Sequence, residues 1–248
     1  MPIYFIRSAQ VDQGHIIIRD QLTHHLRDVL RVEEGEILSL VDEQPKRYAA
    51  RLIESSRSQL VLEIVREESP PPPLLPALHL GVGLLKGEKM EWVIQKATEL
   101  GVARLTPLMT ERAVVRPKSD RIAHQQERWL KIVTEAAQQS GRWTVPKLDP
   151  PMAFKDFLAE SRGNGLKFFF WEGAPPTSPQ AEIASALKAF PKEGTLLIGP
   201  EGGWEKKEVD AAAEAGYRLL SLGSRVLRAE TAVLAALAIV QYEIESRG

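Results

Sequence analysis

From residue 77 onward the sequence alternates between short apolar segments and longer amphipathic ones, and this alternation constrains the fold more than any other feature. The apolar segments, which are typical of strands, are ALHLGVGL, ARLTPLM, LKFFFW, TLLIG and YRLLSLG. Helical patterns such as KMEWVIQKATELG and ETAVLAALAIVQYEI lie between or after them. Strands joined through helices predict a mostly parallel sheet with helices on both faces. We therefore expect an α/β domain in this part of the chain.

The first 68 residues follow a different pattern. Short strand-like runs, among them HIIIR, EILSLVD and QLVLEIVRE, are separated by turn signals, with one helical insertion at THHLRDVLR. This pattern predicts a small antiparallel barrel. The run SPPPPLLP, residues 69–76, cannot enter a helix or a sheet interior, because proline lacks the backbone N–H group and fixes φ. We place the domain boundary there, which gives domains 1–70 and 71–248.

The amino-acid composition excludes several kinds of functional site. The chain has 248 residues, 44% of them hydrophobic, which is enough to form two modest cores. It has no cysteine, which excludes disulfides, thiolate zinc sites and thiol nucleophiles, and its five histidines are too scattered to indicate a metal site. No apolar run is long enough to span a bilayer, and the first residues lack a secretory pattern. We expect a cytoplasmic protein without metal or membrane association.

Charge is unevenly distributed along the chain. The formal net charge is −1, but residues 71–150 hold 12 Lys and Arg against 8 Asp and Glu. Most of the basic residues in this part lie between residues 104 and 131. Such a segment is compatible with a phosphate-binding surface and equally with a solvated helix face.

The turn GPEGG follows the apolar strand at 195–198. Gly199, Gly202 and Gly203 let the backbone approach a ligand without obstruction by side chains. In parallel sheets, ligands bind at the carboxyl ends of strands, where such turns lie. The spacing matches neither a P-loop nor a dinucleotide-binding loop. Glu201 would repel a phosphate but would suit a positively charged ligand, although a turn without function remains an alternative.

A second turn, LGSRVLRAETA, places arginines directly before an apolar helix. The helix dipole disfavours cations at this end by roughly 0.3 to 1 kcal/mol, so Arg225 and Arg228 indicate a functional demand for positive charge. Pairing of Arg228 with Glu230 is the structural alternative. On the helical insertion in the first domain, Arg27 and Arg31 lie four residues apart and would share one face. That face would contact RNA phosphates or simply close the barrel.

Together, LLIGPEGGWEKKEV and LGSRVLRAETAVLAAL resemble the paired signature of the 16S ribosomal RNA uracil N3-methyltransferases, a family of the SPOUT class. Three further segments match in the family's order, namely HHLRDVLRVEEGE, KMEWVIQKATELGVARLTPLMTERAVV and KIVTEAAQQSGRWTVP. The resemblance therefore covers nearly the whole chain. It implies a PUA-like RNA-binding barrel followed by an α/β domain with a deep trefoil knot. Physical reasoning alone would have rejected a knot, because true knots are essentially absent from protein folds.

The resemblance also implies a cofactor and partners. The cofactor is S-adenosylmethionine (SAM), the substrate is 16S rRNA or the small ribosomal subunit, and two copies of the chain form a homodimer in which each active site borrows residues from the other copy. The implied cofactor pocket comprises Ile198, Gly199, Glu201, Gly202, Gly203, Leu222, Gly223, Leu227, Arg228, Thr231 and Ala232.

Other motif positions are implied to face the cleft or the RNA. The cleft-facing positions are Glu99, Thr110, Arg112, Gln138 and Arg142. The expected RNA contacts are His24, Arg27, Arg31, Arg112, Arg116 and Arg142. Val114 stands where many relatives carry serine, so it is not among the expected catalytic residues.

The target atom determines what catalysis requires. Uracil N3 carries a weakly acidic proton that must be removed, and the charge that develops on O2 and O4 must be stabilised. We expect Arg112 or Arg228 to stabilise this charge, with Glu99 or Glu201 as a positioning group or base. N3 lies on the pairing edge, so the base must be unpaired or flipped out. Because the leaving group is a neutral thioether, no metal is required.

Two other functions remain open at this point. Ribose 2′-O-methylation would use the same cofactor pocket but would deprotonate a hydroxyl group. A non-enzymatic RNA-binding assembly factor would keep the fold as a scaffold, although the intact glycine turn at Gly199, Gly202 and Gly203 argues against this. The lack of cysteine excludes the thiolate addition used for methylation at uracil C5.

Overall fold

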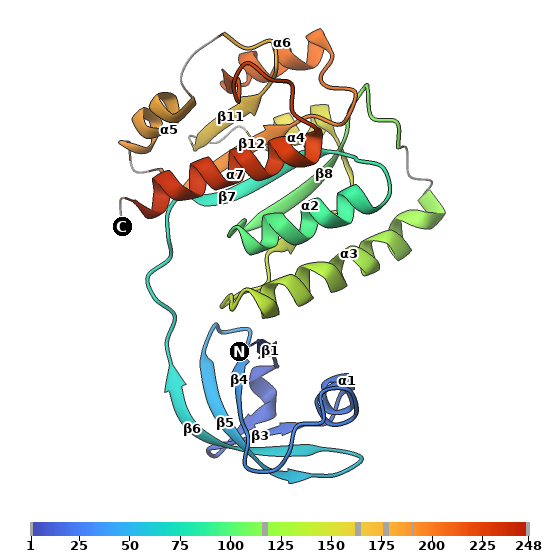
Figure 1. The fold of residues 1–248 in the computed structure, drawn as a ribbon, viewed down its shortest axis with the longest axis vertical. Coiled ribbons are helices and arrows are strands. Elements are labelled where there is room, and N and C mark those ends of the chain that lie inside the picture. Colours follow the sequence, from blue (N-terminus) through green and yellow to red (C-terminus); the bar gives the residue numbers. More distant parts are fainter. Residues whose placement is uncertain (1, 116–118, 162–164, 176–178, 190, 247–248) are drawn as a thin grey trace. The chain divides into compact units, whose positions relative to one another are not determined.

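The computed structural model describes residues 2–115, 119–161, 165–175, 179–189 and 191–246, with only the backbone at 119–121 (Figure 1). The chain forms two compact units. The first consists of residues 1–72 and 137–145, and the second of residues 73–136 and 146–248. The sequence did not indicate that residues 137–145 belong with the first unit. Whether 1–70 and 71–248 fold as independent domains stays a prediction.

The first unit contains a six-stranded sheet with the order β1-β4-β5-β6-β3-β2. Its strands are β1 (Ile3–Phe5), β2 (Val11–Asp12), β3 (His15–Ile18), β4 (Ile37–Val41), β5 (Arg47–Ser55) and β6 (Leu60–Glu68). All pairings are antiparallel except that of β1 with β4, which is parallel. Alternate residues of β5, namely Tyr48, Ala50 and Leu52, are buried, as expected for a sheet with one face in a core.

Short helical segments complete this unit. They are η1 (Ser8–Gln10), α1 (Gln21–His24) and η2 (His25–Val29), and η2 is a turn of π-helix that continues α1. Asp20 caps α1 by accepting a hydrogen bond from the backbone N–H of Leu22 at 2.9 Å. Residues 137–145 are tied to the sheet through Arg47, whose Nη2 donates to the Gly141 carbonyl at 2.8 Å and whose guanidinium lies 4.1 Å from the Trp143 ring centroid.

The second unit is built on a parallel sheet with the order β10-β8-β7-β12-β11-β13, and β9 also pairs with β8. Its strands are β7 (Ala77–Gly83), β8 (Arg104–Met109), β9 (Lys147–Leu148), β10 (Met152–Ala153), β11 (Leu166–Phe170), β12 (Glu193–Ile198) and β13 (Arg218–Leu220). Its helices are α2 (Glu88–Glu99), α3 (Ser119–Gln139), α4 (Phe154–Glu160), α5 (Pro179–Leu187), α6 (Lys206–Glu214) and α7 (Ala229–Glu245). Every pairing between these strands is parallel in the described part of the chain, which confirms the predicted α/β class.

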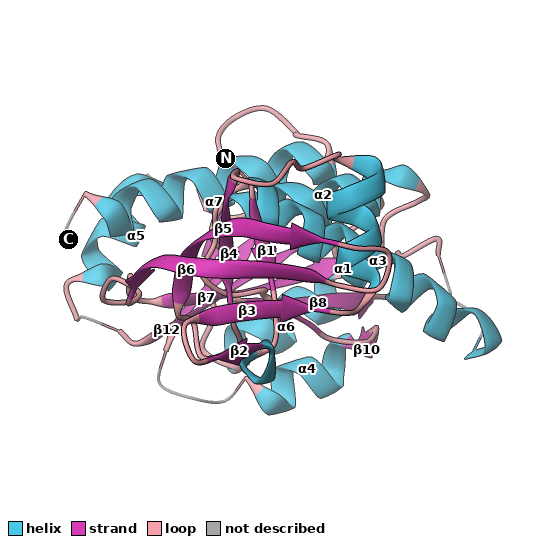
Figure 2. Ribbon diagram, turned by 90° about the horizontal axis from the view of Figure 1, so that it is seen from below, coloured by secondary structure: helices cyan, strands magenta, loops and turns pink. Residues whose placement is uncertain are grey.

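Helices cover both faces of this sheet (Figure 2). Because side chains alternate along a strand, Phe168 and Phe170 pack on one face with α2, α3, α5 and α7, whereas Phe169 packs on the other with α4 and α6. The sheet is thus buried on both sides, as parallel sheets generally are. Among the described residues, no helix has the length and apolar character needed to cross a membrane.

The strand order creates a switch point between β7 and β12. The chain leaves β7 toward β8 on one side and leaves β12 toward β13 on the other side. At such a point the loops that follow the two neighbouring strands diverge and leave a crevice at the carboxyl edge of the sheet. The turn after β12 is the GPEGG segment singled out by the sequence.

Candidate functional site

A cavity of about 670 Å³ lies at the carboxyl edge of the sheet in the second unit. Three loops line it, those that follow β11, β12 and β13, together with residues at the start of α7 and Lys89 in the first turn of α2. We call it the strand-end cavity. Its position next to the β7–β12 switch point is where α/β sheets usually bind ligands.

Most of the predicted cofactor residues line this cavity. Those that do are Ile198, Gly199, Glu201, Gly202, Gly203, Leu222, Gly223, Leu227, Arg228 and Ala232. Thr231 is the exception, since it lies in the first turn of α7 but is not part of the lining. The structure therefore brings together two turns that are separated by α6 and β13 in the sequence. That these residues contact a cofactor stays a prediction.

A third loop, after β11, was missed by the sequence analysis. Phe170, Trp171 and Glu172 line the strand-end cavity, because β11 lies between β12 and β13 and ends at the same edge of the sheet. The loop carries no glycine turn next to a charge, so its local sequence did not indicate a site. The usable signal was the apolar strand LKFFFW, since parallel strands end at one common edge.

The conformation of the glycine turn explains its composition. Gly203 has φ +69°, a left-handed conformation that side chains disfavour. At Gly202, a Cβ atom would lie 2.9 Å from the backbone oxygen of Arg112, so any side chain would push the turn away from the loop after β8. Trp204 fixes the end of the turn, because its Nε1 donates to the carbonyl of Phe170 at 3.1 Å and its ring is buried.

Glu201 is held as a fixed anion on the wall of the cavity. Its Oε1 accepts hydrogen bonds from the backbone N–H of Lys86 at 3.2 Å and from Lys89 Nζ at 3.4 Å. Burial opposes ionisation, but these hydrogen bonds and the charge of Lys89 outweigh it and lower the pKa of Glu201. Glu201 therefore stays ionised near neutral pH and places one carboxylate in a lining that also contains Lys89, Arg225 and Arg228.

Lys89 also contacts Glu230 in the first turn of α7. The Nζ atom lies 3.8 Å from Glu230 Oε2, and that oxygen is buried without a hydrogen-bond partner among the described residues. The pairing of Glu230 with Arg228, which the sequence left open, does not occur in the structure. The positive charge of Arg228 is thus not neutralised by its neighbour on the helix.

Two arginines in the loop before α7 carry unengaged guanidinium groups. Arg225 and Arg228 are exposed, line the cavity, and have no side-chain hydrogen bond or ion pair with any residue that the structure describes. Arg228 is the N-cap residue of α7 with an extended backbone, and its carbonyl accepts from the N–H of Ala232 at 2.8 Å. Its backbone is thereby fixed while its side chain is available to a ligand.

Arg112 reaches the glycine turn from the loop after β8. Its Nε donates to Glu205 Oε1 at 2.8 Å, and its Nη1 donates to the Gly202 carbonyl at 3.3 Å. The hydrogen bond and the charge of Glu205 raise the pKa of Arg112. Arg112 does not line the strand-end cavity, but it touches the back of the turn that forms its wall.

The other predicted cleft residues lie elsewhere. Glu99 is at the end of α2, where its carboxylate accepts from Lys96 Nζ at 2.8 and 2.9 Å, and it does not line the cavity. Thr110 lines a second hollow, between the β8 end, α4 and α6, and its buried Oγ1 has no partner among the described residues. Gln138 and Arg142 belong to the first unit. The structure therefore does not bring Glu99 together with Arg228.

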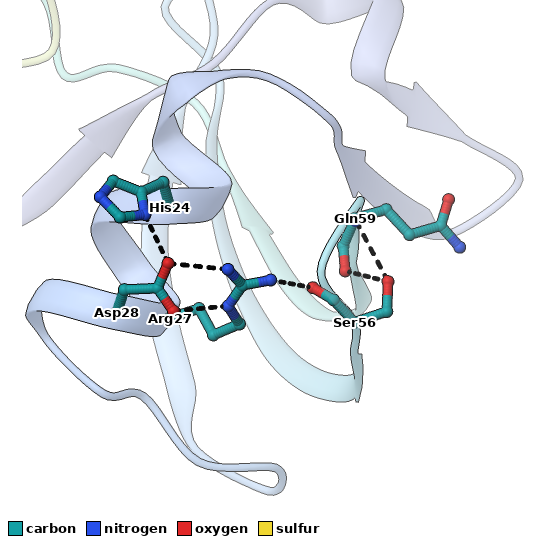
Figure 3. Close-up of polar contacts among 5 residues, drawn as sticks. All are labelled: His24, Arg27, Asp28, Ser56 and Gln59. Atoms are coloured by element: carbon teal, nitrogen blue, oxygen red, sulfur yellow. Dashed lines mark hydrogen bonds and ion pairs between the residues drawn. The ribbon is translucent and has the colours of Figure 1, made fainter.

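Two of the predicted RNA contacts in the first unit, His24 and Arg27, form a connected cluster with Asp28 and Ser56 (Figure 3). Arg27 donates from Nε and Nη2 to the Asp28 carboxylate, both at 2.7 Å, and from Nη1 to the Ser56 carbonyl at 2.8 Å. The hydrogen bond from Arg27 is the main reason that the pKa of Asp28 lies far below its usual value. His24 Nδ1 also contacts Asp28, which leaves the rest of a largely exposed imidazole ring directed away from the cluster. Arg27 therefore connects η2 to the turn between β5 and β6.

The remaining candidates differ in accessibility. Arg31 is exposed and adopts φ +55°, a strained conformation for a residue with a side chain, directly after η2. Arg142 is half-buried, and burial lowers its pKa to about 10, so it still carries charge at neutral pH. Arg116 lies outside the described residues. Within the described part of the chain, no group of three or more His, Cys, Asp or Glu side chains is arranged to hold a metal ion.

Comparison with protein families assigns both parts of the chain. Residues 72–241 match the family model described as an RNA methyltransferase domain. Residues 18–65 match the model described as an RNA methyltransferase PUA domain. The first match covers the sheet of the second unit and the strand-end cavity, and the second covers β4, β5 and most of β6.

Individual methyltransferases resemble this chain over nearly its full length. The Ribosomal RNA small subunit methyltransferase E of Bacillus subtilis is 30% identical, covering 99% of this chain and 98% of that protein. A crystal structure of the protein of that name from Neisseria gonorrhoeae, bound to S-adenosylmethionine, has a TM-score of 0.83 at 30% identity and covers 98% of this chain and 97% of the other. A methyltransferase from Legionella pneumophila in complex with SAM has a TM-score of 0.80 at 31% identity, with 97% and 96% covered. With its PUA domain followed by a methyltransferase domain, this chain belongs to the RNA methyltransferase family.

Proposed function

We propose that this protein transfers a methyl group from SAM to N3 of a specific uridine in 16S rRNA, within the small ribosomal subunit. The observation that carries the proposal is the strand-end cavity, which gathers ten residues of the two predicted cofactor turns in a chain that resembles SAM-bound methyltransferases over its full length. The PUA domain and the unengaged arginines supply the features expected for binding of a polyanion.

The residues present fit SAM. When bound, SAM supplies a methyl group attached to a positively charged sulfur. The glycine turn leaves backbone groups accessible on one side of the cavity, and Leu222 with Gly223 forms another side. The ionised Glu201 on the cavity wall would locally favour the positively charged sulfur, while Lys89, Arg225 and Arg228 add positive charge elsewhere in the lining. Trp171 and Phe170 add apolar surface for a flat ring system.

The arginines of the site would stabilise the charge that develops on the uracil carbonyl oxygens. Arg228 is suited to this role because it lines the cavity and has no internal partner among the described residues. Arg112 is bound to Glu205 and to the Gly202 carbonyl, so we propose that it positions the glycine turn. Glu201 already accepts two hydrogen bonds and has a lowered pKa, which makes it a weak base and favours a positioning role.

Three finer features complete the proposal. We infer a homodimer, a trefoil knot in the methyltransferase domain, and a cytoplasmic location, the last because the proposed substrate is ribosomal RNA. In the PUA domain, His24 and Arg31 are the proposed RNA contacts, since both are exposed. Arg27 is proposed to support them, because its guanidinium is already bound to Asp28 and Ser56.

Deletion of the gene tests the proposal in cells. Nucleosides from small-subunit rRNA are analysed by mass spectrometry before deletion, after deletion, and after the gene is returned. We expect N3-methyluridine to disappear and then to reappear. Loss of a ribose-methylated nucleoside instead would identify the protein as a 2′-O-methyltransferase, and an unchanged nucleoside profile would contradict methylation of this RNA.

A further inference from the structure

The loop between β13 and α7 presents an apolar side chain to solvent at the rim of the strand-end cavity. Val226 is 83% exposed, the highest value for a large hydrophobic residue in the described part of the chain, and it lines the cavity. Single exposed hydrophobic residues are common on protein surfaces. This one differs because it lies at the mouth of the candidate active site.

The loop holds Val226 between two fixed points. At its start, Ser221 Oγ donates to the Gly223 carbonyl at 3.0 Å and accepts from the Gly223 N–H at 3.3 Å. At its end, Arg228 is the N-cap of α7, a helix with several buried residues. The exposed valine is therefore carried on a short connection between an ordered turn and a packed helix.

Positive charge surrounds this side chain. Arg225 precedes Val226 directly and Arg228 follows two residues later, and neither guanidinium has a partner among the described residues. Two unneutralised cations next to an apolar tip are complementary to a nucleic acid, which offers phosphates and stacked bases side by side.

The proposed reaction requires an apolar side chain of this kind near the active site. N3 of uracil lies on the pairing edge, so the base must leave its stack before the atom can be methylated. Proteins that unstack nucleic acids commonly insert an apolar wedge between neighbouring bases. We propose that Val226 is the wedge that fills the gap left in the base stack by the target uridine, while Arg225 binds an adjacent phosphate. This inference rests on the function proposed above.

Single-turnover methylation separates this role from simple binding. The substrate is rRNA from the deletion strain, and rates are measured with saturating rRNA and SAM. Val226→Ser is expected to lower the rate about tenfold or more while the Kd for SAM is unchanged, and Val226→Ile is expected to stay within about twofold of wild type. Arg225→Gln is expected instead to raise the Kd for rRNA and to reduce its salt dependence by about one phosphate contact.

Val65→Ser is the matched control, because Val65 is 50% exposed, lies on β6 in the first unit and does not line the cavity. If Val226→Ser methylates as fast as this control, Val226 is not a wedge. If Val226→Ser changes the molecular mass in solution, Val226 belongs to a contact between copies, which also overturns the inference. The wild-type protein tests the proposed function in the same assay. If it binds SAM and methylates rRNA, the proposed function stands whatever the Val226 variants do. If it does neither, both the proposed function and the role of Val226 are overturned.

Discussion

At the scale of single residues, Arg228 links the fold to the proposed chemistry. Its backbone caps α7, so its guanidinium starts from a fixed point, and no described residue neutralises it. Arg228→Ala is therefore expected to lower the single-turnover methylation rate about 100-fold or more, because one electrostatic contact to the developing charge is lost. The melting temperature should change little, since the side chain is exposed and unpaired.

Arg218→Ala provides the control for this prediction. Arg218 lies on β13, is exposed, and its Nη1 lies 3.4 Å from Glu182 Oε2, away from the cavity lining. Its replacement should leave the methylation rate close to wild type. Equal rates for Arg228→Ala and Arg218→Ala would remove Arg228 from the reaction.

His79 belongs to a buried polar network and is expected to make stability depend on pH. Its Nε2 lies 2.8 Å from Thr106 Oγ1, which donates to Asp149 Oδ2 at 2.6 Å, and burial lowers the pKa of His79 to about 4. Between pH 6.5 and 4 the unfolded chain binds a proton at His79 that the folded protein does not. Stability should therefore fall as the pH decreases through this window, by about 3 kcal/mol at most. Urea unfolding from pH 7 to pH 4 measures this loss.

The variant His79→Gln isolates the contribution of this histidine. It cannot titrate in this window, so its stability should fall less steeply than that of wild type between pH 6.5 and 4. Because carboxylates titrate in both proteins, only the difference between the two curves is informative. Parallel curves would show that His79 is not held neutral in the folded protein.

At the scale of elements, Arg27 joins the π-helical turn η2 to the turn between β5 and β6 (Figure 3). Arg27→Ala is expected to increase amide hydrogen exchange in η2 and in residues 55–60, because the contact between the two segments is lost. His24→Ala is the control, since its ring is largely exposed and contacts only Asp28 in this cluster. Unchanged exchange in Arg27→Ala, combined with weaker rRNA binding, would identify Arg27 as a direct RNA contact instead.

The strands and helices of the second unit could be predicted from the sequence more readily than the contacts between distant residues. The alternation of apolar and amphipathic segments predicted the parallel sheet, because each strand is buried on both faces and each helix on one. The sequence could not predict that residues 137–145 pack with the first unit, because this packing depends on contacts with Arg47, which is distant in the sequence. The pairing of Glu230 with Lys89 was missed for the same reason, because sequence spacing indicates only local partners. The loop at 170–172 carries no local signal and was recognisable only through its strand.

At the scale of the whole molecule, the chain combines a PUA domain with a methyltransferase domain. The proposed homodimer predicts a mass in solution of twice the 27.7 kDa of one chain, because closed two-fold pairing is the most common form of soluble assembly. Light scattering after size-exclusion chromatography, over a range of protein concentrations, measures this mass. A single-chain mass at all concentrations would contradict the homodimer, and activity under the same conditions would show that one chain suffices.

The most direct test of the account asks whether the strand-end cavity supports methyl transfer to uracil N3. Purified protein is incubated with SAM labelled in its methyl group and with rRNA from the deletion strain, and the labelled nucleosides are identified by mass spectrometry. We predict labelled N3-methyluridine with the wild type and almost none with Gly203→Val, because a β-branched side chain at φ +69° distorts the cavity wall. Absence of labelled N3-methyluridine with the wild type, or equal labelling by both proteins, would contradict the account.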